Sequence, residues 1–377
     1  MYLTTQIIQL LKLGKQFRCY VSPLIKKTTV FFKSTRDFFL QQKKAYTYGI
    51  NKSELKTELS NIIKTIEKGK YCELTPSGLA AIYITYVALI KRYTNILIPK
   101  HIYEPNKQTL QAIIQKLKCK IFYYTAITPI KKIYHICIKH SIKIIVIEHP
   151  GSITLDITNL TAIAKIANKL KIITIADNTH SCGLNVKPLT QGIDISIQAL
   201  TKFYCGANDI FMGAIVTNKK LLIKKITKAI SYMGISVQNE DYYTILRNIH
   251  NVIPNFKRSE KKANIIAQWL QQQPQIQTVF YPHIKGKKGG ALVSFITHTR
   301  THAKLYKFID TLKIFKLGYS WGGAKSIVMF YKNLKYTRSY LKMKTTDIVI
   351  RLYIGSENIN DLIQDLTQAL NILNNKL

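Results

Sequence analysis

The sequence feature that most constrains the fold is an alternation that repeats between about residues 52 and 248. An apolar strand, a polar or glycine turn and an amphipathic helix follow one another several times, which is typical of βαβ units and predicts a mostly parallel sheet. The expected strands are continuous runs of β-branched residues, so we expect helices to cover both faces of the sheet. The clearest runs lie at residues 96–98, 144–147, 172–176, 193–197 and 213–216.

The regions on either side of this alternation have a different pattern. Residues 1–51 predict an arm with a short helix and no compact unit, whereas strands near 291–295 and 348–352 and a helix near 358–374 predict a smaller α/β domain with an antiparallel sheet. A chain of 377 residues also exceeds the roughly 250–300 residues at which a single core stops growing. We therefore expect an arm (1–51), a main domain (52–248) and a C-terminal domain (249–377).

The net charge of +37 raises the question of a nucleic-acid or membrane partner. Eight of the 56 basic residues are arginine, which leaves 48 lysines, and isoleucine and asparagine are also abundant. This bias indicates drift in codon composition, and no zinc-finger, RNP or helix-turn-helix signature is present. No apolar run reaches the roughly 18 residues that a membrane span needs. We expect a soluble protein that binds neither nucleic acid nor a membrane.

The six cysteines show no C-x-x-C spacing and no paired histidine pattern. We therefore expect no metal site and no disulfide framework, and a reducing compartment such as the cytoplasm. Apolar residues at helical spacing between Ile7 and Leu13 predict a short helix, with a transit peptide as the open alternative.

Three polar residues directly follow predicted strands or close them. Glu148 follows the run at 144–147, Asp177 follows the run at 172–176, and Lys202 lies just beyond the run at 193–197. In an open parallel sheet, ligands collect beyond the carboxyl ends of the strands. The fold can therefore bring the carboxylate of Asp177 and the amine of Lys202 into one crevice.

An amine and an acid together suit chemistry that depends on pyridoxal phosphate (PLP). The amine bonds covalently to the cofactor, and the acid keeps the pyridine nitrogen protonated so that the ring can accept electrons from Cα. The alternative interpretations are a surface lysine at Lys202 and a helix N-cap at Asp177.

Several short segments resemble the signature blocks of the Cys/Met-metabolism PLP enzymes, in the same order and at similar spacing. The resemblance implies the type I fold of PLP-dependent transferases: a mostly parallel sheet of the seven-stranded kind with helices on both faces, plus a smaller C-terminal α/β domain. The segments are Thr75–Ile82, Tyr103–Pro105, Glu148–Ser152, Asp177–Thr179, Thr201–Lys202, Tyr319–Gly323 and Arg351–Gly355.

The resemblance also implies a role for each matching residue. Lys202, Tyr103 and Asp177 would be catalytic, with Tyr103 stacked on the PLP ring. The residues implied to bind the cofactor are Lys202, Ser77, Gly78, Leu79, Tyr103, Asp177, Thr201 and Tyr48. Those implied to bind the substrate are Arg351, Ser320, Trp321 and Tyr48. Arginine at position 351 supplies a planar fork for a carboxylate that lysine cannot reproduce.

The chain departs from the family pattern at three places. Ile50 stands where the family has an arginine that reaches the phosphate of a neighbouring subunit's cofactor, and Lys52 is the nearest replacement. His180 replaces an aromatic residue, and Leu200 removes a possible phosphate hydroxyl, leaving Thr201. Loss of a charged hydrogen bond would weaken cofactor binding by roughly 10–100-fold.

The resemblance implies a carbon–sulfur lyase that cleaves cystathionine by β-elimination to homocysteine, pyruvate and ammonia. The segment Tyr319–Gly323 favours this branch, and cystathionine γ-synthase or γ-lyase is the alternative within the family. In the implied mechanism Lys202, its pKa lowered by a cationic site, removes the Cα proton. A homotetramer, a dimer of dimers with shared active sites, is also implied. From another class, a decayed, catalytically weak basic protein that binds polyanions remains an alternative.

Overall fold

The computed structural model describes residues 2–11, 22–26, 28–44, 53–284, 287–299 and 301–374. Its larger sheet has seven strands in the order β1-β7-β6-β5-β4-β2-β3, and only β7 runs antiparallel to its neighbours. The expectation of a mostly parallel sheet is confirmed. The strands are β1 (Tyr71–Thr75), β2 (Asn95–Pro99), β3 (Lys120–Tyr124), β4 (Ile142–Glu148), β5 (Ile173–Asp177), β6 (Ile195–Ala199) and β7 (Gly213–Thr217).

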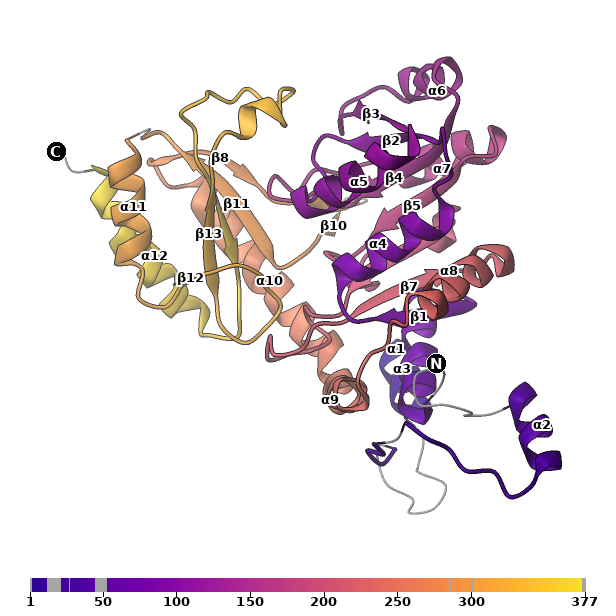
Figure 1. Ribbon diagram of the computed structural model, residues 1–377. Helices are drawn as coiled ribbons and strands as arrows, with labels where there is room; N and C mark the ends of the chain where they lie inside the picture. The colour runs from indigo at the N-terminus through magenta and orange to yellow at the C-terminus, as the bar shows by residue number, and fades with distance from the viewer. Residues whose placement is uncertain are drawn as a thin grey trace.

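Helices cover both faces of this sheet, so that the main domain has three layers (Figure 1). Successive residues of a strand point to opposite faces: in β4, Ile144 and Val146 enter one core, whereas Ile145 and Ile147 enter another. On the first face lie α4 (Gly78–Leu89), α5 (Glu104–Leu117) and α8 (Lys220–Tyr232). On the second face lie α3 (Glu54–Glu67), α6 (Ile130–Lys139) and α7 (Leu160–Lys169).

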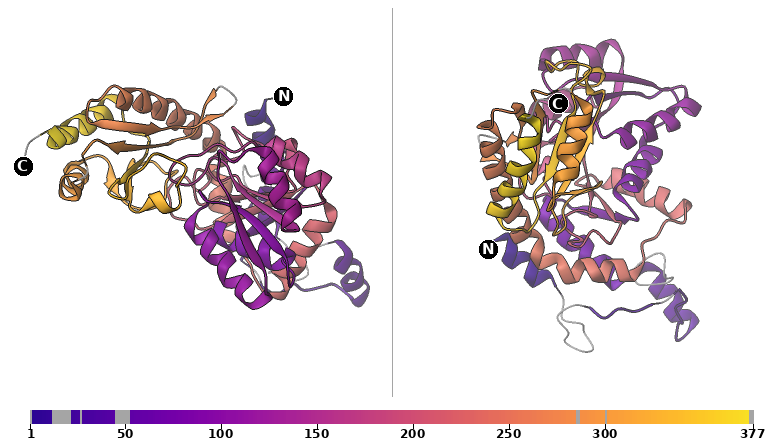
Figure 2. Two further views of the ribbon diagram at one scale, coloured as in Figure 1. Left: turned by 90° about the horizontal axis from the view of Figure 1, so that it is seen from above. Right: turned by 90° about the vertical axis from the view of Figure 1, so that its left-hand side faces the viewer.

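The smaller domain contains a five-stranded sheet in the order β12-β13-β14-β11-β8, antiparallel except between β12 and β13. Three helices pack on one of its faces, and the other face turns toward the main domain (Figure 2). The strands are β8 (Ile276–Phe280), β11 (Leu292–Thr297), β12 (Lys316–Leu317), β13 (Ile327–Tyr331) and β14 (Val349–Tyr353). The helices are α10 (Val252–Gln271), α11 (His302–Thr311) and α12 (Ile359–Asn374).

Helix α10 belongs to both cores. Val252 and Phe256 pack in the main domain, and Ile266 and Leu270 pack against the smaller sheet. The domain boundaries drawn from the sequence therefore stay a prediction. The remaining elements are α9 (Asn239–Asn248), the hairpin of β9 (His283–Ile284) and β10 (Lys287–Lys288), and the 3₁₀ helices η1 (Pro188–Gln191), η2 (Ile249–Asn251) and η3 (Leu334–Tyr336).

The first helix of the predicted arm packs on its own chain. Ile7 of α1 (Leu3–Leu10) is buried in the same core as α3. Helix α2 (Thr35–Lys44), in contrast, stands away from the rest of the chain in all views (Figures 1 and 2) and exposes Phe38, Phe39 and Leu40. Among the described residues, no helix has both the length and the apolar character to cross a membrane.

Candidate active site

The carboxyl ends of β4, β5 and β6 place three singled-out residues at one edge of the larger sheet. Glu148 ends β4 and pairs directly with Asp177, which ends β5. Lys202 lies in the turn that follows β6, the next strand of the sheet. Asp177 raises the pKa of the Lys202 amine, and Lys202 lowers that of the carboxylate, so the two side chains act on each other across this edge.

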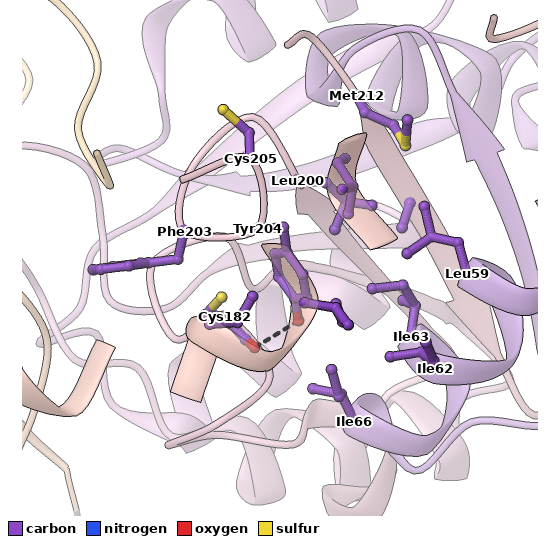
Figure 3. Packing of buried hydrophobic residues seen from close by; sticks show 14 of the residues in the cluster. Leu59, Ile62, Ile63, Ile66, Cys182, Leu200, Phe203, Tyr204, Cys205 and Met212 are labelled. Atoms are coloured by element: carbon purple, nitrogen blue, oxygen red, sulfur yellow. Dashed lines mark hydrogen bonds between the residues drawn. The ribbon is translucent and has the colours of Figure 1, made fainter. Parts of the chain in front are cut away.

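The turn that carries Lys202 is anchored by the residues around it. Leu200, Phe203 and Tyr204 are buried in the core that α3 lines from the opposite side (Figure 3). The Tyr204 hydroxyl donates to the Cys182 carbonyl at 2.9 Å. These buried neighbours anchor the turn in the core, and the Lys202 amine lies at the edge of the sheet.

The Lys202 amine contacts the smaller domain. Its Nζ donates a hydrogen bond to Ser320 Oγ at 2.8 Å and lies 5.3 Å from the centre of the Trp321 ring. Burial and, second, the charge of Arg351 lower the pKa of Lys202 to about 8. The sequence-based expectation named only cationic neighbours, but burial makes the larger contribution.

The loop at 319–323 fits closely over the Lys202 backbone. Gly322 has a φ of +99°, and a Cβ there would lie 2.8 Å from the Lys202 Cα. Trp321 is 8% exposed and packs on Phe203 and His180 with ring centres 6.0 Å apart. The tryptophan therefore has a packing role, and its contact with the substrate stays a prediction.

The Asp177 carboxylate is held by the turn that follows β5. Its Oδ1 accepts from the Thr179 backbone N–H at 3.0 Å, and burial raises its pKa above the ordinary value. The next residue, Asn178, donates to Glu67 Oε1 at 3.0 Å. Glu67 is fully buried, and this burial raises its pKa to about 7. Glu67 is a supporting residue that motif reasoning did not find.

Glu148 orients the residue that we expected to stack on the cofactor. Its Oε2 accepts the Tyr103 backbone N–H at 2.6 Å, and burial and the nearby Asp177 raise its pKa well above the ordinary value. Tyr103 is 45% exposed. Sequence reasoning singled out Glu148 without giving it a role, because no motif shows a contact to a backbone amide 45 positions away.

Arg351 lies on β14 and reaches toward the same edge. Its guanidinium is half-buried, lies 5.2 Å from the Tyr331 ring centre and lowers the pKa of Lys202. Within the described part of the chain, the Arg351 guanidinium makes no hydrogen bond or ion pair. A half-buried cation of this kind is suited to an anionic ligand such as a carboxylate.

The N-terminus of α4 faces the same edge because β1 runs in the same direction as β6. Ser77 Oγ accepts from the Ala80 N–H at 3.0 Å, whereas the amides of Gly78 and Leu79, the first two of the helix, have no carbonyl partner within it. A Cβ on Gly78 would lie 2.6 Å from the Ala199 Cβ, so glycine allows α4 to approach β6.

Thr201, which we expected to bind the phosphate, has other hydrogen-bond partners in the structure. The Thr201 hydroxyl donates to the Met212 carbonyl at 3.3 Å and accepts from the Met212 N–H at 3.1 Å, which closes the turn. The Leu200 side chain is fully buried. Tyr48, Ile50 and Lys52 lie outside the described residues.

Comparison with known proteins identifies the family. The model for the family described as Cys/Met metabolism PLP-dependent enzyme matches residues 4–371. The chain belongs to this family. Its cofactor is therefore pyridoxal phosphate, and the residue set fits that group: an amine with a lowered pKa, an acid beside it, helix amides without a carbonyl partner in the helix, and a guanidinium without a hydrogen-bond partner among the described residues.

Two relatives and one solved structure show how similar the chain is to characterised members. It is 31% identical to cystathionine beta-lyase of Haemophilus influenzae over 82% of this chain and 81% of the relative. It is 27% identical to L-alanine/L-glutamate racemase of Wolbachia pipientis over 96% of each chain. Its fold matches cystathionine gamma synthase from Xanthomonas oryzae in complex with cystathionine, with a TM-score of 0.90, 21% identity and 99% coverage of both chains.

Proposed function

We propose that this enzyme is a carbon–sulfur lyase that cleaves cystathionine by β-elimination to homocysteine, pyruvate and ammonia. The observation that carries the proposal is the Lys202 amine, whose pKa is about 8, held by Ser320 near the Arg351 guanidinium. An amine that is partly neutral near physiological pH can accept a proton from Cα. The similarity to a cystathionine beta-lyase supports the choice of substrate.

Each residue of the site has a proposed role in this reaction. Lys202 holds the cofactor covalently and, once released, takes the Cα proton. Asp177 places a negative charge against the pyridine nitrogen, and the Gly78 and Leu79 amides bind the phosphate together with the helix dipole. When bound, the cofactor supplies a sink for the electrons that the Cα proton leaves behind.

The substrate-side residues orient cystathionine. Arg351 pairs with its α-carboxylate through a bidentate fork, and Ser320 releases the Lys202 amine when the substrate arrives. Tyr103 covers the reacting face, where Glu148 keeps its backbone in place. Thr201, by contrast, closes the turn with its hydroxyl, so its proposed contribution is to position Lys202.

Exposed apolar residues on α4 support a dimer as the smallest active unit. Leu79, Tyr83 and Val87 are 39%, 43% and 37% exposed and follow one another at helical i, i+4 spacing, which makes one stripe on a helix that is apolar all round. The stripe begins at the proposed phosphate site. A second copy of the chain that covers it would bring its own arm, with Tyr48, toward this site; the full assembly we propose is a homotetramer.

An amino-acid racemase is a second candidate, because the racemase relative matches 96% of both chains. Racemisation and β-elimination begin with the same removal of the Cα proton, so the site geometry suits both. Cystathionine γ-synthase and γ-lyase activities are further alternatives within the family. The products separate all of these reactions.

The test is a product assay on purified protein loaded with pyridoxal phosphate. Cystathionine should yield pyruvate and homocysteine in equal amounts; 2-oxobutyrate instead would indicate γ-cleavage, and D-alanine or D-glutamate formed from the L-amino acids would indicate a racemase. Lys202→Ala should abolish turnover, whereas Lys116→Ala, an exposed lysine on α5, is the matched control. Borohydride reduction and peptide mapping should find the pyridoxyl group on Lys202; a label elsewhere would overturn the site.

A further inference from the structure

Two loops of the main domain hold the part of the site around Tyr103 and Glu148. The first, residues 100–103, follows β2 and ends at Tyr103; the second, residues 149–158, follows β4 and begins directly after Glu148. Glu148 joins the two loops through its hydrogen bond from the Tyr103 N–H at 2.6 Å. The position of Tyr103 therefore depends on how these two loops are held.

Arg338, from the smaller domain, connects both loops. It lies in the segment between β13 and β14 and is 2% exposed. Its guanidinium donates to the Lys100 carbonyl at 2.9 Å and the His101 carbonyl at 3.3 Å in the first loop. In the second loop it donates to the Ser152 carbonyl at 2.8 Å and to Thr154 Oγ1 at 2.9 Å.

The surroundings of Arg338 strengthen this connection. Asp156 Oδ2 lies 3.9 Å from the Arg338 Nε, and its other oxygen accepts from the Tyr340 hydroxyl at 2.6 Å. Ile153 packs against Leu334 and its neighbours in the smaller domain. Polar and apolar contacts thus fix the second loop to the segment that contains Arg338.

Arginine is the side chain that this position requires. Four acceptors in different directions need the planar group with five N–H donors, whereas a lysine ammonium offers three donors from one point. In a chain with 48 lysines among its 56 basic residues, an arginine buried at this place indicates that the geometry of the fork matters.

We propose that Arg338 is a positioning residue, which sets the distance between the Tyr103 face of the site and the carboxylate-binding Arg351. The segment that holds Arg338 leads directly into β14, on which Arg351 lies, so one short piece of chain carries both arginines. Arg338 acts on the reaction through Tyr103, Glu148 and Arg351 and does not contact substrate. Only the kinetic part of the test depends on the proposed function; the hydrogen-exchange part does not.

The test compares Arg338→Lys with Arg92→Lys, an exposed arginine in the main domain, both as full-length protein. Without cofactor, hydrogen exchange should become faster in peptides that cover 100–103 and 149–158 and stay unchanged in the peptide that covers 71–89. With cofactor, kcat/KM for cystathionine should fall about 10–100-fold, mostly through KM, because a misplacement of about 1 Å has effects of this size. Tyr340→Phe, which removes one hydrogen bond, should show a smaller change in the same direction.

The outcomes separate this inference from the proposed function. Unchanged exchange in both loops in Arg338→Lys and Arg338→Met would overturn it, as would exchange that rises equally throughout the chain, which would indicate general destabilisation. Normal KM despite faster loop exchange would overturn the positioning role. If exchange responds as expected but wild-type protein turns over no cystathionine, the anchoring of the loops is supported and the proposed function fails.

Discussion

At the scale of single residues, the Lys202 amine is subject to opposing influences. Burial and the charge of Arg351 favour its neutral form, whereas Asp177 favours the charged form. The first two prevail, so that the pKa falls to about 8, and the Ser320 hydroxyl accepts a hydrogen bond from the amine in either form. A lysine with this pKa can serve as a base near neutral pH.

This balance predicts the pH dependence of Lys202 reactivity. In the cofactor-free protein, acetylation of Lys202 should rise with pH and reach half of its maximal rate near pH 8. Competitive labelling with acetic anhydride followed by mass spectrometry measures this, with exposed lysines of the same sample as internal standards. A midpoint near the ordinary lysine pKa of 10.5 would contradict the described surroundings of the amine.

A second residue-scale prediction concerns Glu67. Because burial raises its folded-state pKa from 4.5 to about 7, its contribution to stability is present below pH 4.5 and is lost as the pH rises through 7. Between these values Glu67→Gln should gain about 3 kcal/mol of unfolding free energy relative to wild type. Urea unfolding at several pH values measures the difference, and Glu54→Gln, on an exposed site of the same helix, is the control. A difference that does not change with pH would refute a buried, protonated Glu67.

At the scale of elements, the site depends on how closely α4 approaches β6. Gly78 begins α4 against the backbone and side chain of Ala199, and Gly213 of β7 lies against the Ser77 carbonyl. Glycine at both positions lets the helix N-terminus reach the sheet edge at which Lys202 lies. The helix amides and the lysine are thereby placed at one edge.

Gly78→Ala should separate these two elements. An added Cβ would lie 2.6 Å from the Ala199 Cβ, so the helix must shift, at a cost of about 1–3 kcal/mol in unfolding free energy. Affinity for pyridoxal phosphate should fall as well, and fluorescence titration measures it. Gly318→Ala, whose Cβ would meet only Ile327 at 3.9 Å, is the control and should leave both quantities unchanged. Equal behaviour of the two variants would count against the proposed phosphate site.

The element scale also shows which strands a sequence can reveal. The five strands expected from apolar runs are β2, β4, β5, β6 and β7, and these are the five interior strands of the sheet. The two that were not recognised, β1 and β3, are its edges. An edge strand has a neighbour on one side only, so it tolerates charged residues. Glu73 interrupts β1, and β3 begins with Lys120 and continues with aromatic residues in place of the β-branched runs of the interior strands.

At the scale of the whole molecule, the two domains meet around the site. The smaller domain contributes Ser320, Trp321 and Arg351, the main domain contributes Lys202 and Asp177, and α10 belongs to the cores of both. Such an arrangement keeps the substrate-side residues at a fixed place relative to the lysine.

The apolar stripe on α4 gives a prediction at this scale. Tyr83→Glu should convert the assembly into smaller species, because a charge would lie in the proposed contact between two copies. Analytical ultracentrifugation measures the change, and Tyr336→Glu on η3 of the smaller domain, an exposed tyrosine outside the stripe, is the control. A wild-type protein that sediments as a monomer, or a Tyr83→Glu variant with unchanged mass, would contradict the dimer.

The sequence by itself determined the interior strands, the parallel sheet and the placement of Asp177 and Lys202 at the ends of successive strands, because hydrophobic periodicity and the succession of elements along the chain are local properties. Only the tertiary structure decided which side chains support them. Glu67 meets Asn178 across 111 positions, Lys202 meets Ser320 across 118, and Arg338 meets Thr154 across 184. Contacts over such separations arise from the packing of whole elements, which no local pattern of residues encodes.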